Sequence, residues 1–248
     1  MRISVCMATY NGALYIEEQL QSIIIQLDND AEIIISDDHS TDSTIQKILN
    51  LKDPRIKIFT NDGKRGPIYN TENALKQSKG DLVFLADQDD IWYPEKISVI
   101  TPLMDKYDLV LSDATIIDQS GNILHPSFFK ENYSGNGFIR NWVNNSFMGC
   151  CMAFNRKILD YALPFPANLA MHDMWIGLNA ALVGKCCFLC QPLVYYRRHG
   201  QNTIVSLKKT HLPVSYQIHY RIVMMYDIFV RFFQRKLKKR SPEKKIQK

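Results

Sequence analysis

The sequence lacks several features that would place it in a specialised class of protein. None of its apolar runs approaches the ~18–20 residues that span a bilayer, which argues against a transmembrane protein. The opening Met1–Cys6 is too short, and too soon followed by the polar run Thr9–Gly12, to be a signal peptide. There is no internal repeat, and no low-complexity linker before residue 206. With 46% hydrophobic and 22% charged residues, we expect a cytosolic globular protein of one large domain, with or without an appendage.

The chain also lacks a second C-x-x-C motif, which weighs against a structural zinc site. Its six cysteines are Cys6, Cys150, Cys151, Cys186, Cys187 and Cys190. Adjacent cysteines inside apolar runs are typical of small hydrophobic residues in a reduced protein. The alternative is half of a zinc site, formed by Cys187-x-x-Cys190 beside Cys150-Cys151.

The part of the chain expected to fold, residues 1–205, also lacks an excess of basic residues. Residues 1–205 carry 18 Lys and Arg against 23 Asp and Glu, a net charge of −5, whereas residues 206–248 carry 12 against 2, a net charge of +10. Nucleic-acid-binding domains carry their basic face on the folded module, so nucleic acid is not an expected partner. A mildly acidic body with a basic tail indicates that the body carries out the chemistry and that the tail binds an anionic surface.

Short apolar runs alternate with stretches of helical periodicity. The patterns predict strands at 3–8, 32–36, 55–60, 81–86 and 109–111 and helices at 13–27, 42–51, 70–78 and 93–104. In the second half they predict polar loops at 135–147, strands at 150–154, 185–189 and 193–197, and a helix at 173–183. Strands separated by helices imply an α/β fold with a mostly parallel, Rossmann-like sheet flanked by helices. In such sheets, ligands bind beyond the carboxyl ends of the strands.

Polar runs follow three of the predicted strands. They are Thr9–Gly12, Asp37–Ser40 and Asp87–Asp90. Because the carboxyl ends of parallel strands share one edge, we expect these runs to converge. Up to five carboxylates on one edge would repel each other unless a cation lay between some of them. Oxygen ligands indicate a hard ion, Mg²⁺ or Mn²⁺.

Each polar run also has a structural explanation. Asn11-Gly12 and Asp37–Asp42 are ordinary turn and helix-cap sequences. Asp87–Asp90 is harder to explain in this way, since three acids after a buried strand are costly without a counterion. The acidic run is therefore the strongest indication of function.

The basic tail contains an apolar repeat. Its members, spaced three or four positions apart, are Ile222, Tyr226, Phe229, Phe233 and Leu237. With Lys and Arg interleaved, this spacing predicts a basic amphipathic helix that lies on an anionic membrane surface. The alternative is a helix packed on its own domain with a solvated charge run. We expect residues 241–248 to be disordered.

Together these motifs resemble the family 2 glycosyltransferases, whose fold is called GT-A. The matching motifs are VCMATYNG (5–12), IIISDDHSTD (33–42), GPIYNTENAL (66–75), LADQDDIWYP (85–94), MHDMW (171–175) and YRRHGQN (196–202). DQDDIW together with RHGQN looks like the bacterial branch that builds O-antigen and capsular polysaccharides. The resemblance implies a GT-A domain over 1–205, with a nucleotide-sugar half at 1–110 and an acceptor half at 111–205, followed by a membrane-associating tail at 206–248.

The resemblance implies a role for each matching residue. The nucleotide-sugar ligands are Thr9, Tyr10, Asn11, Asp38, Asn70, Asn73, Asp87 and Asp90, with Trp92 as a stacking candidate. Asp87 and Asp89 form the D-x-D pair that holds Mn²⁺ or Mg²⁺, and Asp89 is the better candidate for direct contact. His199 lies where some relatives place a further metal or diphosphate ligand. The family's usual arginine near Asn70 is missing, and Lys64-Arg65 lies slightly upstream.

Asp173 matches the family's catalytic base. Family 2 enzymes invert the anomeric centre, so one carboxylate must deprotonate the acceptor hydroxyl. His172 replaces the glutamate that many members carry, and with Trp175 it is a candidate for contact with the acceptor. The structural alternatives are a helix N-cap for Asp173 and simple packing for Trp175 and Trp92.

The resemblance implies an inverting, metal-dependent enzyme that transfers a hexose from UDP-galactose, UDP-glucose or dTDP-rhamnose. Its acceptor would be a polyprenyl-diphosphate-linked saccharide at the cytoplasmic face of the inner membrane. One alternative is a sugar-1-phosphate nucleotidyltransferase, which normally has a glycine-rich loop where Thr9–Gly12 has one glycine. A non-catalytic nucleotide-sugar-binding module is disfavoured by the joint presence of a metal pair and a base.

Overall fold

The computed structural model describes residues 1–199 and 213–240. The R-H-G-Q-N motif is therefore described only as far as His199, and the predicted disorder of 241–248 lies outside the described residues. Within these ranges, nine strands form one sheet in the order β3-β2-β1-β4-β8-β6-β9-β5, with β7 paired to β6. The strands are β1 (Ile3–Thr9), β2 (Glu32–Asp37), β3 (Ile56–Thr60), β4 (Leu82–Asp87), β5 (Ile91–Trp92), β6 (Leu109–Asp118), β7 (Ile123–His125), β8 (Met152–Asn155) and β9 (Cys186–Arg198).

The first four strands form the parallel part of the sheet. Val5 of β1 pairs with Ile33 of β2 on one side and with Phe84 of β4 on the other. The β-branched and aromatic residues of β1, β2 and β4 are buried on both faces, as parallel sheets require, whereas the edge strand β3 is only partly buried. The predicted α/β fold with a mostly parallel sheet is confirmed.

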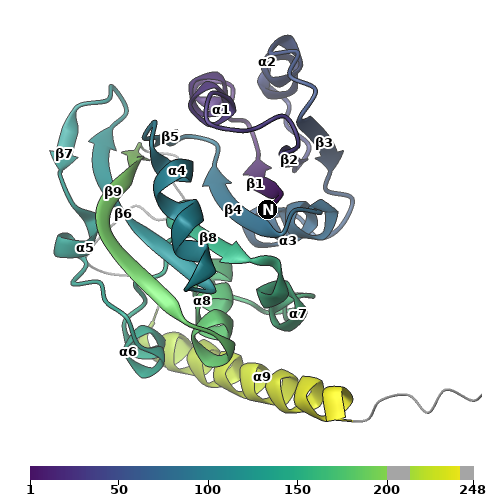
Figure 1. Ribbon diagram of the computed structural model, residues 1–248, viewed down its shortest axis with the longest axis vertical. Coiled ribbons are helices and arrows are strands. Elements are labelled where there is room, and N and C mark those ends of the chain that lie inside the picture. Colours follow the sequence, from purple (N-terminus) through teal and green to yellow (C-terminus); the bar gives the residue numbers. More distant parts are fainter. Residues whose placement is uncertain (200–212, 241–248) are drawn as a thin grey trace, which may run out of the picture.

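Four helices accompany this part of the sheet. They are α1 (Ile16–Ile24), α2 (Thr44–Asn50), α3 (Pro67–Gln77) and α4 (Lys96–Ile100). Figure 1 shows α1 and α2 on one side of β1–β3 and α3 on the other. Helix α1 is shorter than predicted because the carbonyl of Gly12 first closes a turn with the amides of Tyr15 and Ile16. Helix α3 starts three residues early because Pro67 fits the first helical turn.

The second half of the sheet is built around β6 and β9. β6 runs antiparallel to β8 and parallel to β9. The prediction of two strands at 185–189 and 193–197 is wrong, since β9 is continuous over 13 residues. Pro192, which cannot donate to a ladder, pairs with Asp113 where the β6–β9 register shifts. An irregularity in the pairing thus accommodates the proline without ending the strand.

Short helices cover the second half. They are α5 (Phe128–Glu131), α6 (Phe138–Val143), α7 (Leu159–Ala162) and α8 (His172–Val183). The predicted polar loop at 135–147 contains α6, and α8 confirms the predicted helix at 173–183.

The last described element is α9 (Val214–Arg240), which packs along α7 and α8 at one end of the molecule (Figure 1). Its inner face carries Tyr220, Met224 and Ile228, spaced four residues apart and buried. Trp142 Nε1 donates to the carbonyl of Arg221 (3.0 Å), and Arg221 Nε donates to the carbonyl of Trp142 (3.0 Å). The tail helix therefore packs on the domain, as the structural alternative predicted. No helix in the described ranges has the length and apolar character needed to cross a membrane.

Candidate active site

Two loops are bound together beyond the carboxyl ends of β1 and β2. Thr9 Oγ1 donates to Asp37 Oδ1 (2.9 Å), and Asp37 Oδ2 accepts from the amide of Ser40 (2.8 Å). Asn11 has a φ of 47°, a left-handed conformation that asparagine tolerates well, and its Oδ1 accepts from the amide of Thr41 (2.8 Å). These bonds give Thr9 and Asn11 a structural role, and their contact with a nucleotide stays a prediction.

Asp38 and Asn70 connect the same edge to the start of α3. Asp38 is buried and accepts from Asn61 Nδ2 (3.0 Å) and from the amide of Gly66 (2.7 Å), where the chain has a φ of 107°. Asn70 Nδ2 donates to the carbonyl of Thr9 (3.0 Å), while its buried Oδ1 has no hydrogen-bond partner among the described residues. Asn73 Nδ2, one turn later, donates to Ser36 Oγ (2.8 Å). The predicted nucleotide-side residues are thus gathered at one edge.

Gln88 joins this edge to the acidic loop after β4. Its Oε1 accepts from the amide of Tyr10 (2.9 Å), and its Nε2 donates to the carbonyl of Tyr10 (3.0 Å). The Tyr10 ring remains 53% exposed and thus accessible for stacking. A side chain at Gly12 would displace the Gln88 amide from this position, because an added Cβ would lie 2.3 Å from Gln88 Oε1. The convergence expected from strand order is confirmed, and the sequence patterns had not indicated the part played by Gln88.

The acidic loop concentrates negative charge in a small volume. Ligand atoms of Asp87, Asp90 and Cys150 all lie within 4.8 Å of one another. Although Asp87 keeps solvent contact, desolvation and the charges of Asp89 and Asp173 raise its pKa to about 7. Desolvation and the neighbouring Asp89 and Asp87 also raise the pKa of Asp90 well above its usual range. Such mutual repulsion is what a bound cation relieves.

The carboxylates of this loop fit a hard divalent cation. Asp90 Oδ1 accepts from the amide of Arg197 (2.9 Å), but its buried Oδ2 has no hydrogen-bond partner in the described part of the chain. Hydrogen bonding with Cys151 and desolvation raise the pKa of the Cys150 thiol, so the thiol stays protonated and is a poor ligand. Oxygen donors remain, which suit Mg²⁺ or Mn²⁺. Among the described residues, no cluster of three potential metal ligands includes Cys187 or Cys190, so the zinc alternative has no support there.

His199 is brought to the acidic loop by the end of β9. Its Nε2 lies 2.7 Å from Asp89 Oδ2, and its ring stacks on Tyr15 with centroids 5.1 Å apart. Arg197 anchors this end through an ion pair with Glu18 (2.7 Å) and a bond from its Nε to the carbonyl of Asp89 (2.9 Å). His199 therefore adjoins Asp89, where the resemblance placed it, and its role as a metal ligand stays a prediction.

Asp173 lies in the first turn of α8, close to the acidic cluster. A Cβ placed on Gly149 would lie 4.0 Å from Asp173 Cβ and 3.4 Å from His172 Nε2, and the next residue is Cys150 of the acidic cluster. Desolvation raises the pKa of Asp173 to about 6 and lowers that of His172 to about 4. The N-cap residue of α8 is Met171, so the N-cap explanation of Asp173 is wrong. A carboxylate with a raised pKa is suited to act as a general base near neutral pH.

Both tryptophans are buried, which contradicts the prediction that they contact sugars. Trp92 is 2% exposed, and the ammonium of Lys96 lies 4.0 Å from its ring centroid. Trp175 is fully buried, with the guanidinium of Arg231 4.9 Å from its ring centroid. Neither ring has a face available to a ligand, because both side chains are buried and a cation of the chain also lies over each ring. Packing, the structural alternative, explains both.

Lys96 was missed by sequence reasoning. It is fully buried, its Nζ donates to the carbonyl of Cys150 (2.7 Å), and desolvation lowers its pKa to about 8. The charge of Lys96 acts on Asp87, so it is a resident cation beside the acidic loop. The one sequence signal was its position on the apolar face of the helix, with Ile97 and Ile100.

Comparisons with known proteins show which proteins this chain is similar to. The model of the family described as "Glycosyl transferase family 2" matches residues 4–162. An uncharacterized glycosyltransferase of Nostoc is 30% identical over 227 residues, covering 83% of this chain and 67% of that protein. The UDP-Glc:α-D-GlcNAc-diphosphoundecaprenol β-1,3-glucosyltransferase WfgD of Escherichia coli is 25% identical over 226 residues, covering 87% and 84%.

A solved structure shows the same fold. The crystal structure of residues 1–349 of S. aureus TarS in complex with UDP-GlcNAc superposes with a TM-score of 0.73 at 21% identity. The superposition covers 92% of this chain and 66% of that fragment.

Proposed function

The chain belongs to glycosyl transferase family 2 and is a glycosyltransferase, and we propose that it transfers a hexose from a nucleoside diphosphate sugar to a lipid-diphosphate-linked saccharide with inversion. The observation that carries the proposal is the proximity of the acidic loop and Asp173 through Gly149-Cys150. An inverting transferase needs such an arrangement, because the diphosphate leaves from one face of the anomeric carbon while the acceptor hydroxyl, deprotonated by the base, attacks the opposite face. A nucleotidyltransferase needs no such base, and the family assignment excludes that alternative.

The donor would bind along the edge formed by β1, β2 and α3. Tyr10 offers an exposed ring for the nucleobase, and Asp38 lies beside the expected ribose position, already fixed by Asn61 and Gly66. Asn70 Oδ1, buried without a partner among the described residues, is free to accept a hydrogen bond from the donor. WfgD supports a UDP-sugar, and UDP-galactose, UDP-glucose and dTDP-rhamnose form the donor set to test.

Mn²⁺ or Mg²⁺ would be held by Asp89 and Asp87, with His199 as a further ligand. When bound, such an ion offsets the charge that develops on the leaving diphosphate. Asp90 would hold the loop in place through the amide of Arg197. Asp173 would accept the proton of the attacking acceptor hydroxyl, while the low pKa of His172 keeps that side chain neutral and able to hydrogen-bond the acceptor.

The outer face of α9 would bring the enzyme to the membrane that holds the acceptor. Six apolar side chains of this face, between 39% and 68% exposed, are Ile218, Ile222, Tyr226, Phe229, Phe233 and Leu237. Their spacing of three or four residues forms a stripe opposite the buried Tyr220 and Met224. Near an anionic leaflet, each neighbouring Lys or Arg adds about 1 kcal/mol. The proposed location is therefore the cytoplasmic face of the inner membrane, with α9 in the interface.

The proposal is tested by incubating the protein with the three donors, Mn²⁺ and a synthetic GlcNAc-diphosphate-lipid. We expect release of nucleoside diphosphate and formation of a disaccharide with one of the donors. Asp89→Ala should abolish both this transfer and the Mn²⁺ dependence of nucleotide binding. Asp105→Ala is the matched control, because Asp105 is exposed and precedes the start of β6, the end of that strand opposite to the one that pairs with Arg198. Full activity of Asp89→Ala would refute the metal assignment.

A further inference from the structure

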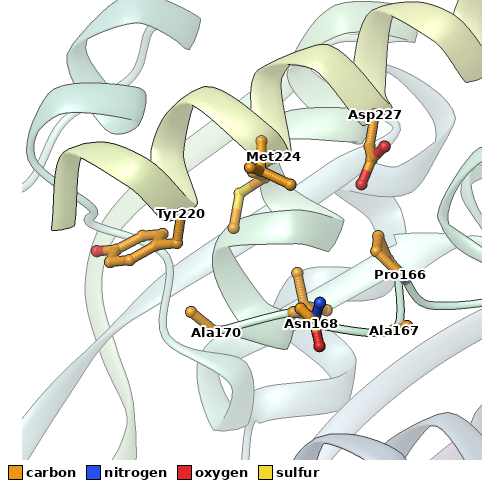
Figure 2. Close-up of a pocket in the computed structure, with 9 residues that line it drawn as sticks. Pro166, Ala167, Asn168, Ala170, Tyr220, Met224 and Asp227 are labelled. Atoms are coloured by element: carbon orange, nitrogen blue, oxygen red, sulfur yellow. The ribbon is translucent and has the colours of Figure 1, made fainter. Parts of the chain in front are cut away.

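A groove lies between α9 and the loop that leads into α8. It has a volume of about 200 Å³ and is separate from the acidic loop. Figure 2 shows Tyr220, Met224 and Asp227 of α9 on one side and residues Pro166–Ala170 of the loop on the other. The lining is mostly apolar, with polar side chains at Tyr220, Asp227 and Asn168.

One end of this groove lies beside the proposed catalytic base. The Tyr220 hydroxyl donates to Met171 Sδ (3.9 Å), and Met171 immediately precedes His172 and Asp173. Besides desolvation, the charge of Asp173 contributes to a raised pKa of Tyr220, which places the two groups within electrostatic range. A molecule bound in the groove would therefore extend toward the carboxylate that activates the acceptor.

Two polar side chains of the groove have unused hydrogen-bonding capacity. Within the described ranges, the side chains of Asn168 and Asp227 form no hydrogen bond or ion pair, although the charge of Asp227 acts on Arg231 one turn later. The Asp227 carboxyl group points toward the loop (Figure 2). We propose that the groove binds a sugar ring of the acceptor, with the ring against Met224 and Tyr220 and its hydroxyls on Asp227 and Asn168. This inference rests on the proposed function and assigns the acceptor subsite within it.

A sugar ring matches the groove better than a lipid chain. A pyranose presents apolar C–H groups on its faces and hydroxyls around its edge, which fits an apolar lining with a carboxylate and an amide. An isoprenoid chain would cover Asp227 without offering a hydrogen bond, and burial of an unpaired carboxylate is costly. The volume is also below the ~300–1,000 Å³ typical of pockets for drug-sized ligands, so it suits one ring.

Residues at and just before the start of α3, on the donor side, hydrogen-bond to the loop that forms one wall of the groove. Lys64 Nζ donates to the carbonyl of Ala167 (3.4 Å), and the Tyr69 hydroxyl donates to the same carbonyl. The amide of Phe165 donates to Glu72 Oε1 of α3 (2.9 Å). The loop therefore connects the first turns of α3, on the donor side, to α9. This connection would fix the acceptor ring relative to the donor.

Val223→Trp tests the inference by filling the groove from α9, and Asp227→Ala removes its carboxylate. The probes are hexosyl and N-acetylhexosaminyl diphosphates, each on a short water-soluble alkyl chain and on a long isoprenoid chain. We expect both variants to raise the acceptor KM by about tenfold or more, equivalent to about 1.4 kcal/mol per tenfold, with either chain length. Donor KM and donor hydrolysis without acceptor should not change. The thermal midpoint of each variant checks that it is folded.

Ile222→Trp is the matched control, since it places the same side chain one residue away on the outer stripe. It should leave the KM of the short-chain acceptor unchanged. An unchanged acceptor KM in Val223→Trp and Asp227→Ala would overturn the subsite, and so would an increase seen only with the long chain, which would indicate a lipid groove. If the wild-type protein transfers to no acceptor of the panel, the proposed function itself fails.

Discussion

The donor side and the acceptor side of the site are stabilised in different ways. On the donor side, loops after parallel strands are held by bonds between side chains and backbone, as in Asn70 to Thr9 (3.0 Å) and Gln88 to Tyr10 (2.9 and 3.0 Å). On the acceptor side, Asp173 sits in the first turn of α8, a helix packed against α9. The donor edge is thus fixed by local hydrogen bonds, whereas the acceptor side depends on packing between distant segments.

The comparison predicts that the two sides can be inactivated separately. Asp173→Asn keeps the shape of the side chain but removes the base, so we expect kcat to fall by about 10²–10⁴-fold. Donor binding should persist, because the donor edge has its own hydrogen bonds. Isothermal titration of the donor with Mn²⁺, alongside the transfer rate, measures both. Unchanged turnover would reassign the base, and lost donor binding would show that the two sides are not separable.

The raised pKa of Asp173 gives this prediction a pH dependence. A base with a pKa of about 6 is protonated below that pH, so activity should rise with pH through about 6 and then level off. Below pH 6 the rate should fall about tenfold per pH unit. The Asp173→Asn variant should lack this acidic limb in its residual activity.

The second prediction concerns the outer face of α9. Replacing Ile222, Phe229 and Phe233 with serine should weaken binding to anionic phospholipid vesicles by about 100-fold. These side chains are already about half-buried on the protein, so each would contribute about 1 kcal/mol, roughly half the value for a fully buried side chain. Transfer to a short-chain soluble acceptor should not change. The control replaces Ile25, Leu49 and Ile123, which are also exposed but lie elsewhere, and should bind vesicles like the wild type. Equal binding by the two triple variants would exclude α9 as the membrane contact.

Sequence reasoning was accurate where local patterns determine the structure. Alternating apolar and helical periodicity predicted β1 to β4 and the edge on which Thr9, Asp38 and Asp87 converge. These positions depend on the strand order and on short crossover connections between parallel strands, which are almost always right-handed. The role of Asp173 came from the family resemblance, since a single Asp before an apolar helix is otherwise ambiguous.

The rest could not be predicted because it depends on contacts between distant segments. The groove requires α9 to lie beside Pro166–Ala170, some fifty residues away in sequence, and no periodicity encodes that packing. The burial of Trp92 and Trp175 likewise involves contacts with Lys96 and Arg231, residue types that are usually exposed to solvent. The type of a residue thus predicted its role correctly only where the position of its own strand or helix also determined which residues surround it.

The smallest expected effects concern the two cation–tryptophan pairs. Lys96 lies over Trp92 beside the acidic loop, and Arg231 of α9 lies over Trp175 of α8 on the acceptor side. Lys96→Met should destabilise the protein by about 2 kcal/mol, because it leaves the carbonyl of Cys150 without its donor and removes a cation beside the acidic loop.

Arg231→Met should cost only about 1 kcal/mol, since methionine still packs on Trp175 and Arg231 is less deeply buried than Lys96. Of the two carbonyls that Arg231 contacts, that of Ala162 keeps its hydrogen bond from Trp175 Nε1 (2.8 Å), and Pro164 is exposed to water. At about 2–4 °C per kcal/mol, thermal unfolding resolves the two losses. Only Lys96→Met should also alter Mn²⁺ binding, since only Lys96 acts on Asp87. Equal losses, with Mn²⁺ binding unchanged in both variants, would mean that Lys96 serves packing alone and that the charge of the acidic loop is balanced without it.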